Sequence, residues 1–134
     1  MIAQGKSVIV LGDLNDGPGL DEYEHLFGRS SIEIVMGQEL DPEAHLFDPH
    51  AERALRAPLL DQVSSARFYQ KHEKRYLEAL LDYIFVTHDL RKFAHNWTIW
   101  HPFDHPACWS DRDLQNALLT ASDHFPVTLD LRFE

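Results

Sequence analysis

The chain has 134 residues, 44% of them hydrophobic and 11% aromatic, which is enough apolar material for a folded core and argues against disorder. Its 22 acidic and 12 basic side chains give a formal net charge of -10, so non-specific binding to a nucleic-acid backbone is not expected. Cys108 is the single cysteine, which excludes an intramolecular disulfide, and the N-terminal apolar run is too short for a signal peptide or a membrane span. We therefore expect a single domain over residues 1–134 in the cytoplasm.

The first half of the chain predicts one strand and several short helices. Residues 7–11 form a continuous aliphatic and β-branched run, which is typical of a strand buried on both faces. Turn-forming residues at 13–19 end this strand. Helix signals follow at three places: acidic residues and Gly28 bound a helix at 20–27, Ser31 caps a turn that reaches Met36, and Asp48-Pro49 begins a helix that reaches Ala57.

The second half of the chain predicts four strands, at 66–69, 80–87, 97–100 and 125–133. The last of these alternates cleanly, with its apolar residues on one face and its polar residues on the other. Between the strands lie a charged connection at 71–75, a His- and Pro-rich loop at 101–110 and a helix near 113–119. Strands separated by helices and long loops predict an α/β or α+β fold, in which helices flank a mixed β-sheet.

The first polar site follows the first strand. Asp13 and Asn15 are two residues apart, so in an extended backbone their side chains converge while Leu14 packs away. A carboxylate beside a carboxamide can hold an attacking water and a phosphate oxygen. The same residues also form turns readily, and for this segment alone the turn is the better interpretation.

The second polar site is Asp82, which lies in an apolar run and shares a strand face with Ile84 and Val86. A carboxylate at such a position is costly unless it has a partner. A histidine whose tautomer the carboxylate fixes would serve, and so would the backbone amides of a loop. The residues around Asp82 do not distinguish these two partners.

The third polar site is Ser122-Asp123-His124, just before the last strand. Pro126 favours a loop here, so the adjacent Asp123 and His124 can serve one site. A carboxylate oxygen suits Mg²⁺, and a neighbouring histidine can act on a phosphoryl group as an acid, a base or a hydrogen-bond donor. A bound cation reverses the local field of carboxylates, so the negative net charge does not exclude phosphate chemistry.

Taken together, the three sites resemble the C-terminal motifs of the endonuclease/exonuclease/phosphatase family. The segments occur in the order of that family and near its spacing, and the resemblance spans about Ser7 to the C-terminus: Gly12-Asp13-Leu14-Asn15, Leu81-Asp82-Tyr83-Ile84-Phe85 and Ser122-Asp123-His124-Phe125-Pro126. It implies divalent-metal-dependent hydrolysis of a phosphoester, with phosphodiesterase or nuclease chemistry, and a substrate that could be nucleic acid, phospholipid or inositol phosphate. It also implies one half of a four-layer α/β sandwich.

The resemblance implies a role for each matching residue. Asp13 would orient or deprotonate the attacking water, and Asn15 would contact the scissile phosphate. Asp123 would bind the catalytic Mg²⁺ or Mn²⁺. His124 would contact the phosphate and stabilise developing charge, while Asp82 would orient its ring.

The N-terminal half of the family domain would supply an Asn, the principal metal-binding Glu and a further His or Tyr. No counterpart of these residues precedes Ser7. We therefore expect the chain to correspond to the C-terminal half of the family domain and to be incomplete as an enzyme alone. Such a half would expose an apolar sheet face, through which a homo-oligomer or an N-terminal half could bind.

Two other functions remain open from the sequence. The loop residues His101, Asp104, His105 and Cys108 could bind Zn²⁺ or Ni²⁺ in a non-catalytic metal-binding or interaction module. Pro102 and Pro106 break the regular spacing of these ligands, so an ordinary loop is the favoured interpretation. The chain could also be an inactive relative in which the three motifs are purely structural.

Two groups of side chains bear on nucleic-acid binding. The basic residues of the charged connection form a small patch, for which a solvated turn is favoured over a DNA groove: Lys71, Lys74 and Arg75. Three tryptophans could stack on bases, although packing is the favoured interpretation: Trp97, Trp100 and Trp109.

Overall fold

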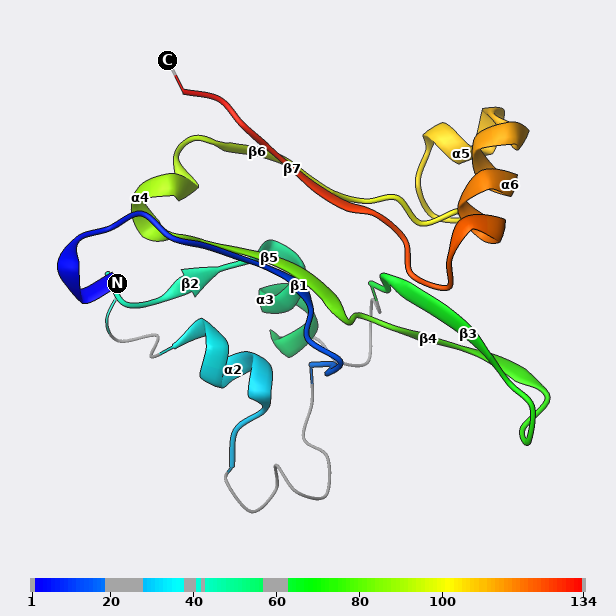
Figure 1. The fold of residues 1–134 in the computed structure, drawn as a ribbon, viewed down its shortest axis with the longest axis horizontal. Helices are drawn as coiled ribbons and strands as arrows, with labels where there is room; N and C mark the ends of the chain where they lie inside the picture. The colour runs from blue at the N-terminus through cyan, green and yellow to red at the C-terminus, as the bar shows by residue number, and fades with distance from the viewer. Residues whose placement is uncertain (1, 19–27, 38–40, 42, 57–62, 134) are drawn as a thin grey trace.

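Strand β5 (Asp82–Thr87) is the centre of the main sheet, whose strand order is β1-β5-β2. It pairs antiparallel with β1 (Ile9–Asp13) on one side and with β2 (Leu46–Phe47) on the other. The computed structural model describes residues 2–18, 28–37, 41, 43–56 and 63–133, and a short 3-10 helix, η1 (Ile2–Gln4), precedes β1. Figure 1 shows the path of the chain through these elements.

Helices α2 (Ser31–Met36) and α3 (Pro49–Arg56) lie on one side of this sheet (Figure 1). The start of α2 is a capping box, because the Ser30 side chain accepts from the Glu33 amide and the Glu33 carboxylate accepts from the Ser30 amide. The Asp48 side chain caps the start of α3, with Oδ1 accepting from the His50 amide at 2.8 Å. Its second oxygen, Oδ2, accepts from the Ile84 amide at 2.8 Å and so attaches α3 to β5.

The hydrophobic core lies between these helices and one face of β5. Tyr83 and Phe85 are buried on this face, and their rings stack at 5.3 Å. Because alternate residues of a strand point to opposite faces, Asp82 and Ile84 belong to the other face. The buried core cluster contains the following residues: Ile32, Met36, Leu46, Ala51, Leu80, Tyr83, Phe85 and Ile99.

Two further pairs of antiparallel strands form separate two-stranded sheets. Strands β3 (Ala66–Gln70) and β4 (Arg75–Ala79) pair around a turn at 71–74, and β6 (Ala94–Ile99) pairs with β7 (Val127–Leu131). Three helices complete the described elements: α4 (His88–Arg91), α5 (Ala107–Ser110) and α6 (Arg112–Ala121). The arrangement confirms the predicted α/β class, and every strand pair among the described residues is antiparallel.

Strand β1 is not buried on both faces, so the interpretation of its continuous apolar run is wrong. The Val10 side chain packs against the core, whereas Ile9 is 41% exposed and Leu11 is 69% exposed. Among the described residues, α2 and α3 lie on the Val10 side of the sheet, and the other side of β1 is exposed at Ile9 and Leu11. Leu11 shares that open side with Asp13, and the open side therefore combines apolar and acidic residues.

Most of the other predicted elements are present with shifted ends. The strands predicted at 66–69, 80–87, 97–100 and 125–133 correspond to β3, β5, β6 and β7, and the helix near 113–119 corresponds to α6. Ser30 rather than Ser31 caps α2. The sequence did not predict β2, β4, α4 or α5, and the helix expected at 20–27 lies outside the described residues. Within the described residues, no helix is both long and apolar enough to cross a membrane.

Candidate functional site

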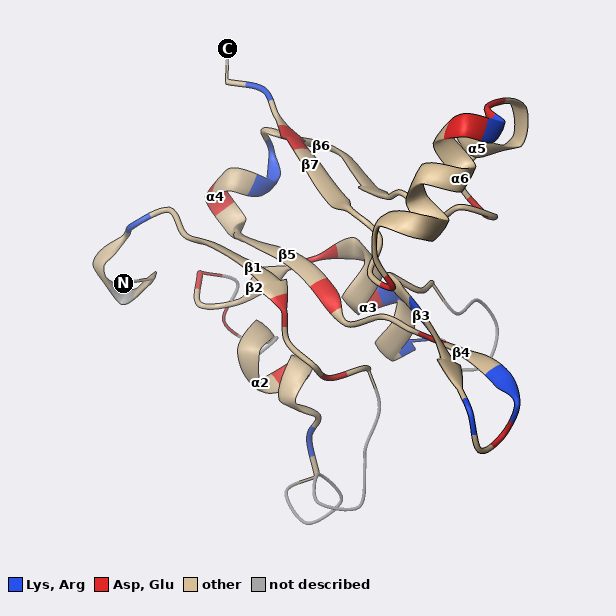
Figure 2. Ribbon diagram, turned by 45° about the vertical axis from the view of Figure 1, so that its right-hand side comes forward, with Lys and Arg blue, Asp and Glu red and all other residues tan. Residues whose placement is uncertain are grey.

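Strands β1 and β5 place two carboxylates side by side. Asp13, the last residue of β1, is the register partner of Asp82, the first residue of β5, and Figure 2 shows acidic positions on both strands. Directly opposed residues of antiparallel strands have Cβ atoms about 4.5–5.5 Å apart, so two like charges there destabilise the pair unless a cation offsets them. Gly12 has a φ of 142°, a conformation that L side chains rarely adopt, and glycine is therefore required directly before Asp13.

His124 completes a cluster with these two carboxylates. Its backbone forms a β-bridge with Ala66, and its Nδ1 lies 2.9 Å from Oδ2 of Asp82. One ligand atom each from Asp13, Asp82 and His124 lies within 4.8 Å of the others, and we call these residues the Asp13–Asp82–His124 cluster. Of the two partners that the sequence left open for Asp82, the structure provides the histidine. The Ser65 hydroxyl also donates to the same carboxylate oxygen.

The contact with Asp82 determines the protonation of His124. An ionised carboxylate only accepts hydrogen bonds, so Nδ1 of His124 carries a proton and Nε2 is the ring atom left for another partner. The hydrogen bond that His124 Nδ1 donates to the Asp82 carboxylate raises the pKa of His124, and the charges of Asp82, Asp13 and Asp123 act in the same direction. Partial burial opposes this rise. The imidazole is therefore biased toward its cationic form, which offsets part of the repulsion between the carboxylates.

Ser65 is a site residue that the sequence did not reveal. Its buried hydroxyl donates to Oδ2 of Asp82 at 2.7 Å and accepts from the backbone amides of Leu81 and Asp82 at 3.0 and 2.9 Å. Its carbonyl also accepts from the Phe125 amide at 2.6 Å. Ser65 thus fixes the Asp82 carboxylate and joins the start of β5 to the segment that carries His124. A serine before a strand gives no sequence signal for this role.

The backbone at Asn15 is not extended. Strand β1 ends at Asp13, and Asn15 has a left-handed φ of 52° with its amide donating to Oδ1 of Asp13 at 2.8 Å. The interpretation that extended geometry makes the two side chains converge is therefore wrong, because the chain turns between them. The contact is an Asx-type turn, and it holds the Asp13 carboxylate in place.

Asp123 is exposed and lies outside the Asp13–Asp82–His124 cluster. Its carbonyl accepts from the Arg67 amide at 2.7 Å, which attaches the loop before β7 to the base of β3. Its carboxylate acts on His124 through its charge. The structure thus brings Asp13, Asp82 and His124 together directly and places Asp123 beside them.

Tyr83 stabilises the loop that follows β1. Its buried hydroxyl donates to the carbonyl of Asp16 at 2.9 Å or to that of Leu80 at 2.8 Å. Burial raises the pKa of Tyr83 well above its ordinary range, with neighbouring carboxylates adding to the effect. The phenol therefore stays protonated, and its role is to hold loop and strand together rather than to transfer protons.

A groove of about 340 Å³ runs along the cluster. One side is formed by residues of β1 and β5 and the other by the segment that leads into β7. Its walls are mainly apolar, with Asp82 and His124 as the polar groups, which is a usual composition for a ligand site. The lining residues are Leu11, Gly12, Asp82, Tyr83, Ile84, His124, Phe125, Pro126 and Val127.

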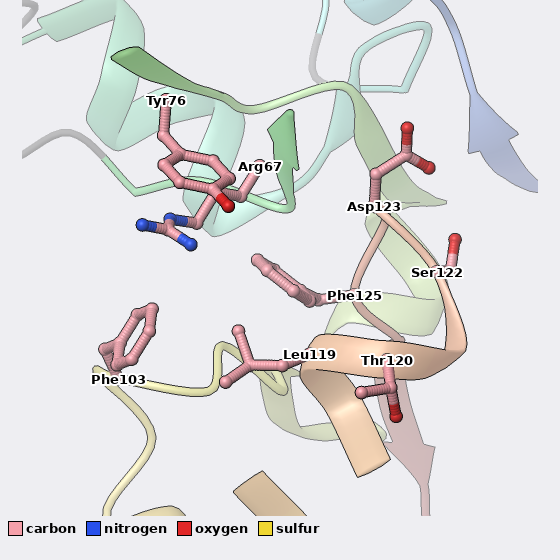
Figure 3. Close-up of a pocket in the computed structure, with 8 residues that line it drawn as sticks. All are labelled: Arg67, Tyr76, Phe103, Leu119, Thr120, Ser122, Asp123 and Phe125. Atoms are coloured by element: carbon pink, nitrogen blue, oxygen red, sulfur yellow. The ribbon is translucent and has the colours of Figure 1, made fainter. Parts of the chain in front are cut away.

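A second pocket of about 510 Å³ lies on the other side of the His124 segment (Figure 3). Arg67 and Tyr76 of the β3–β4 hairpin face Phe103 and Leu119 across it, and Phe125 lies between them. The Asp123 carboxylate points away from Arg67 and Tyr76 in this view. The pocket therefore joins the candidate site to the hairpin.

In the His- and Pro-rich loop, the Nδ1 atoms of both histidines contact backbone amides of the loop itself. His101 Nδ1 lies 3.3 Å from the amides of Phe103 and Asp104, and His105 Nδ1 accepts from the Ala107 amide at 3.2 Å. The His105 ring stacks on Trp100 at 4.4 Å. In the described part of the chain, the acidic and histidine side chains that lie close enough together to share a metal ion are those of the Asp13–Asp82–His124 cluster. The side chains of this loop do not form such a cluster.

Comparison with known proteins gives one match. The model of the family described as "Endonuclease/Exonuclease/phosphatase family" matches residues 1–124, a span that contains the whole cluster. Comparisons with curated proteins and with solved structures gave no match.

Proposed function

Because the chain belongs to the endonuclease/exonuclease/phosphatase family, whose members are generally phosphoester hydrolases, we propose that it contributes to divalent-metal-dependent hydrolysis of a phosphoester. The observation that carries this proposal is the Asp82–His124 contact of 2.9 Å beside Asp13. An imidazole fixed by a carboxylate is suited to act on a phosphoryl group. The apolar groove beside it offers a place for the substrate.

His124 would act on the phosphate through Nε2. Asp82 holds Nδ1, so a protonated ring presents Nε2–H as a donor to a phosphate oxygen or to the leaving group. The raised pKa of His124 increases the fraction of rings that carry this proton near neutral pH. A cationic donor stabilises the negative charge that develops on the phosphoryl oxygens.

Asp13 would orient or deprotonate the attacking water. Its carboxylate is exposed at the end of β1, and the Asn15 amide holds one of its oxygens at 2.8 Å. The other oxygen is then suited to accept from a water molecule. Asn15 is exposed beside it, and its carboxamide would contact the scissile phosphate.

The charge balance of the site fits a divalent cation. Three carboxylates, Asp13, Asp82 and Asp123, act on one imidazole, so even a protonated His124 leaves an excess of negative charge. Asp123 and Asp13 would supply the oxygen ligands that Mg²⁺ and Mn²⁺ prefer. A bound cation would polarise the phosphoryl oxygens and neutralise developing charge.

The proposal is tested by p-nitrophenol release from bis(p-nitrophenyl) phosphate with Mg²⁺, with Mn²⁺ and with EDTA. We expect release that depends on the cation and is lost in Asp123→Ala and Asp13→Asn. Asp104→Asn, an exposed carboxylate in the His- and Pro-rich loop, is the matched control and should retain activity. Background release in every condition would contradict activity of this chain alone, and would fit either an inactive relative or a half-domain that needs its missing half. Unchanged release in Asp123→Ala would contradict the metal-binding role of Asp123.

The open side of β1 supports the predicted association with a second chain. Leu11 and Ile9 expose apolar surface next to the groove, and the structure shows no helix on that side of β1 among the described residues. Burial of such a surface against a homologous sheet would be favourable. We therefore retain a homo-oligomer or a docked N-terminal half as the partner of this face.

A further inference from the structure

Strand β1 forms the outer edge of the main sheet. Among the described residues, it pairs with β5 on one side and with no strand on the other. The Thr87 amide donates to the Val8 carbonyl, and the Leu14 amide donates to the Leu81 carbonyl. Both pairs continue the β1–β5 register, in which every second pair is hydrogen-bonded. The even-numbered residues of β1 therefore bond to β5, and the odd-numbered residues direct their amides and carbonyls to the free edge.

The free edge of β1 is open to pairing with another strand. Within the described part of the chain, the backbone groups of Ile9 and Leu11 that point to this edge have no backbone partner. Ile9 is 41% exposed and Leu11 is 69% exposed. Residues 7–13 contain no proline and no lysine, and β1 has no bulge in its register with β5. Because proteins usually protect unpaired edges with such features, this edge has the properties of a surface that another strand covers.

A second copy of the chain fits this edge, because β1 is complementary to itself in antiparallel pairing. When Ile9 lies opposite Leu11 of the second copy, a two-fold axis passes beside Val10 and the exposed apolar side chains pair on one face. A shift of two residues places Ile9 opposite Asp13, or Leu11 opposite Ser7, and so pairs apolar with polar side chains. Residues 5–13 contain one basic and one acidic side chain, so two copies with a formal net charge of -10 each would meet along a nearly neutral segment.

We propose that two copies of the chain pair through the free edges of β1, antiparallel and with Ile9 opposite Leu11 of the second copy. Each such pair exchanges both of its backbone hydrogen bonds, and the two main sheets become one continuous sheet. In this register Asp13 lies opposite Ser7 of the second copy, so a hydroxyl rather than another carboxylate lies beside the Asp13–Asp82–His124 cluster. A two-fold arrangement uses both free edges and therefore stops at the dimer. This inference rests on the homo-oligomer that accompanies the proposed function, and its tests measure association rather than hydrolysis.

The direct test is hydrogen exchange of individual amides, measured by NMR at one protein concentration that sedimentation velocity shows to be monomeric and at one that it shows to be dimeric. The amides of Val10 and Gly12 should exchange slowly at both concentrations, because they bond to β5. The Leu11 amide should exchange rapidly in the monomer and become protected in the dimer. Rapid exchange at Leu11 in the dimer would show that the copies associate through another surface, and it would overturn the inference.

Leu11→Pro tests the same contact by removing the amide that points to the free edge. Proline is tolerated at the edge of a sheet, and its side chain keeps the position apolar. A two-fold dimer of this variant lacks two hydrogen bonds, so its dissociation constant should rise by between about fivefold and about 150-fold. Leu11→Val is the matched control, because it keeps the amide and should dimerise as wild type does. Circular dichroism shows whether Leu11→Pro folds, and if it does not, the exchange of the Leu11 amide in wild type decides the test.

Three further results would overturn the inference: a wild type that stays monomeric at every concentration, assembly that grows beyond the dimer, or a folded Leu11→Pro that dimerises as tightly as wild type. Release of p-nitrophenol from bis(p-nitrophenyl) phosphate, measured on the same samples, separates this inference from the proposed function. A dimer with a protected Leu11 amide but no metal-dependent release would retain the pairing and contradict hydrolysis by this chain alone. Metal-dependent release by a protein that is always monomeric would retain the hydrolase and reject the pairing.

Discussion

His124 and Asp82 are 42 residues apart in the sequence, and Nδ1 of the histidine lies 2.9 Å from Oδ2 of the aspartate. The same carboxylate oxygen accepts from the Ser65 hydroxyl at 2.7 Å. The imidazole is therefore oriented by a carboxylate that is itself held by a buried side chain. Such a support limits the motion of the ring and preserves its protonation pattern.

Asp82→Asn should lower the pKa of His124. The pKa of His124 is raised in the folded chain, so protonation of the ring stabilises the fold. This stabilisation is fully present at pH values below the unfolded pKa of about 6.5, and it is lost as the pH rises through the folded pKa. The difference in unfolding free energy between wild type and Asp82→Asn should therefore be larger near pH 6 than at alkaline pH. NMR titration of the ring measures the pKa directly, and an identical value in both proteins would contradict the coupling.

Ser65→Ala should impair both the fold and the site. The substitution removes a donor to Asp82 and leaves the amides of Leu81 and Asp82 without their hydroxyl partner, which costs about 1–3 kcal/mol for each buried group left unpaired. Urea denaturation measures this loss. Ser64→Ala is the matched control, since Ser64 is also buried and its hydroxyl has no hydrogen-bond partner among the described residues. Equal stability of the two variants would show that the hydrogen bonds of Ser65 do not stabilise the fold.

Asp48→Ala should destabilise the sheet as well as α3. The side chain caps the helix and also satisfies the Ile84 amide of β5, so its loss combines a capping cost of about 1 kcal/mol with an unpaired buried amide worth about 1–3 kcal/mol. Asp111→Ala removes an exposed cap from α6 and should cost about 1 kcal/mol. Denaturant midpoints compare the two, and a smaller effect at Asp48 than at Asp111 would contradict this double role.

Leu11→Asn should reduce self-association if the open side of β1 is an interface. Sedimentation velocity at increasing protein concentration would then show a rising sedimentation coefficient for wild type and a flatter dependence for the variant. Ile34→Asn is the control, because Ile34 is 62% exposed on α2, which lies on the other side of the sheet. A monomer at every concentration for wild type would reject the homo-oligomer.

The sequence predicted the strands that carry the site but not every contact within it. The apolar run around Asp82 indicates both a strand and the need for a partner, because a carboxylate in such a run must be paired. It cannot indicate Ser65, since that contact depends on how residues 17 positions apart meet. The prediction for Asn15 failed for a local reason: its backbone is left-handed, whereas the prediction assumed that the chain stays extended from Asp13 to Asn15.

The missed elements depend on tertiary pairing. Strand β4 has Arg75 and Glu78 in exposed positions and therefore has the composition of a connection, and its pairing with β3 defines it as a strand. The burial of β1 was overestimated because a continuous apolar run does not reveal whether a second layer covers the sheet. Exposed Leu11 shows that composition alone does not establish burial.

The most direct test of the account compares p-nitrophenol release from bis(p-nitrophenyl) phosphate by wild type and by His124→Asn, at saturating Mn²⁺ and with EDTA. General acid–base catalysis contributes about 100- to 10,000-fold, so His124→Asn should reduce the metal-dependent rate by at least about 100-fold. The wild-type rate should fall to background with EDTA. Equal metal-dependent rates in the two proteins, or a wild-type rate that EDTA leaves unchanged, would contradict a metal-dependent hydrolase that acts through His124.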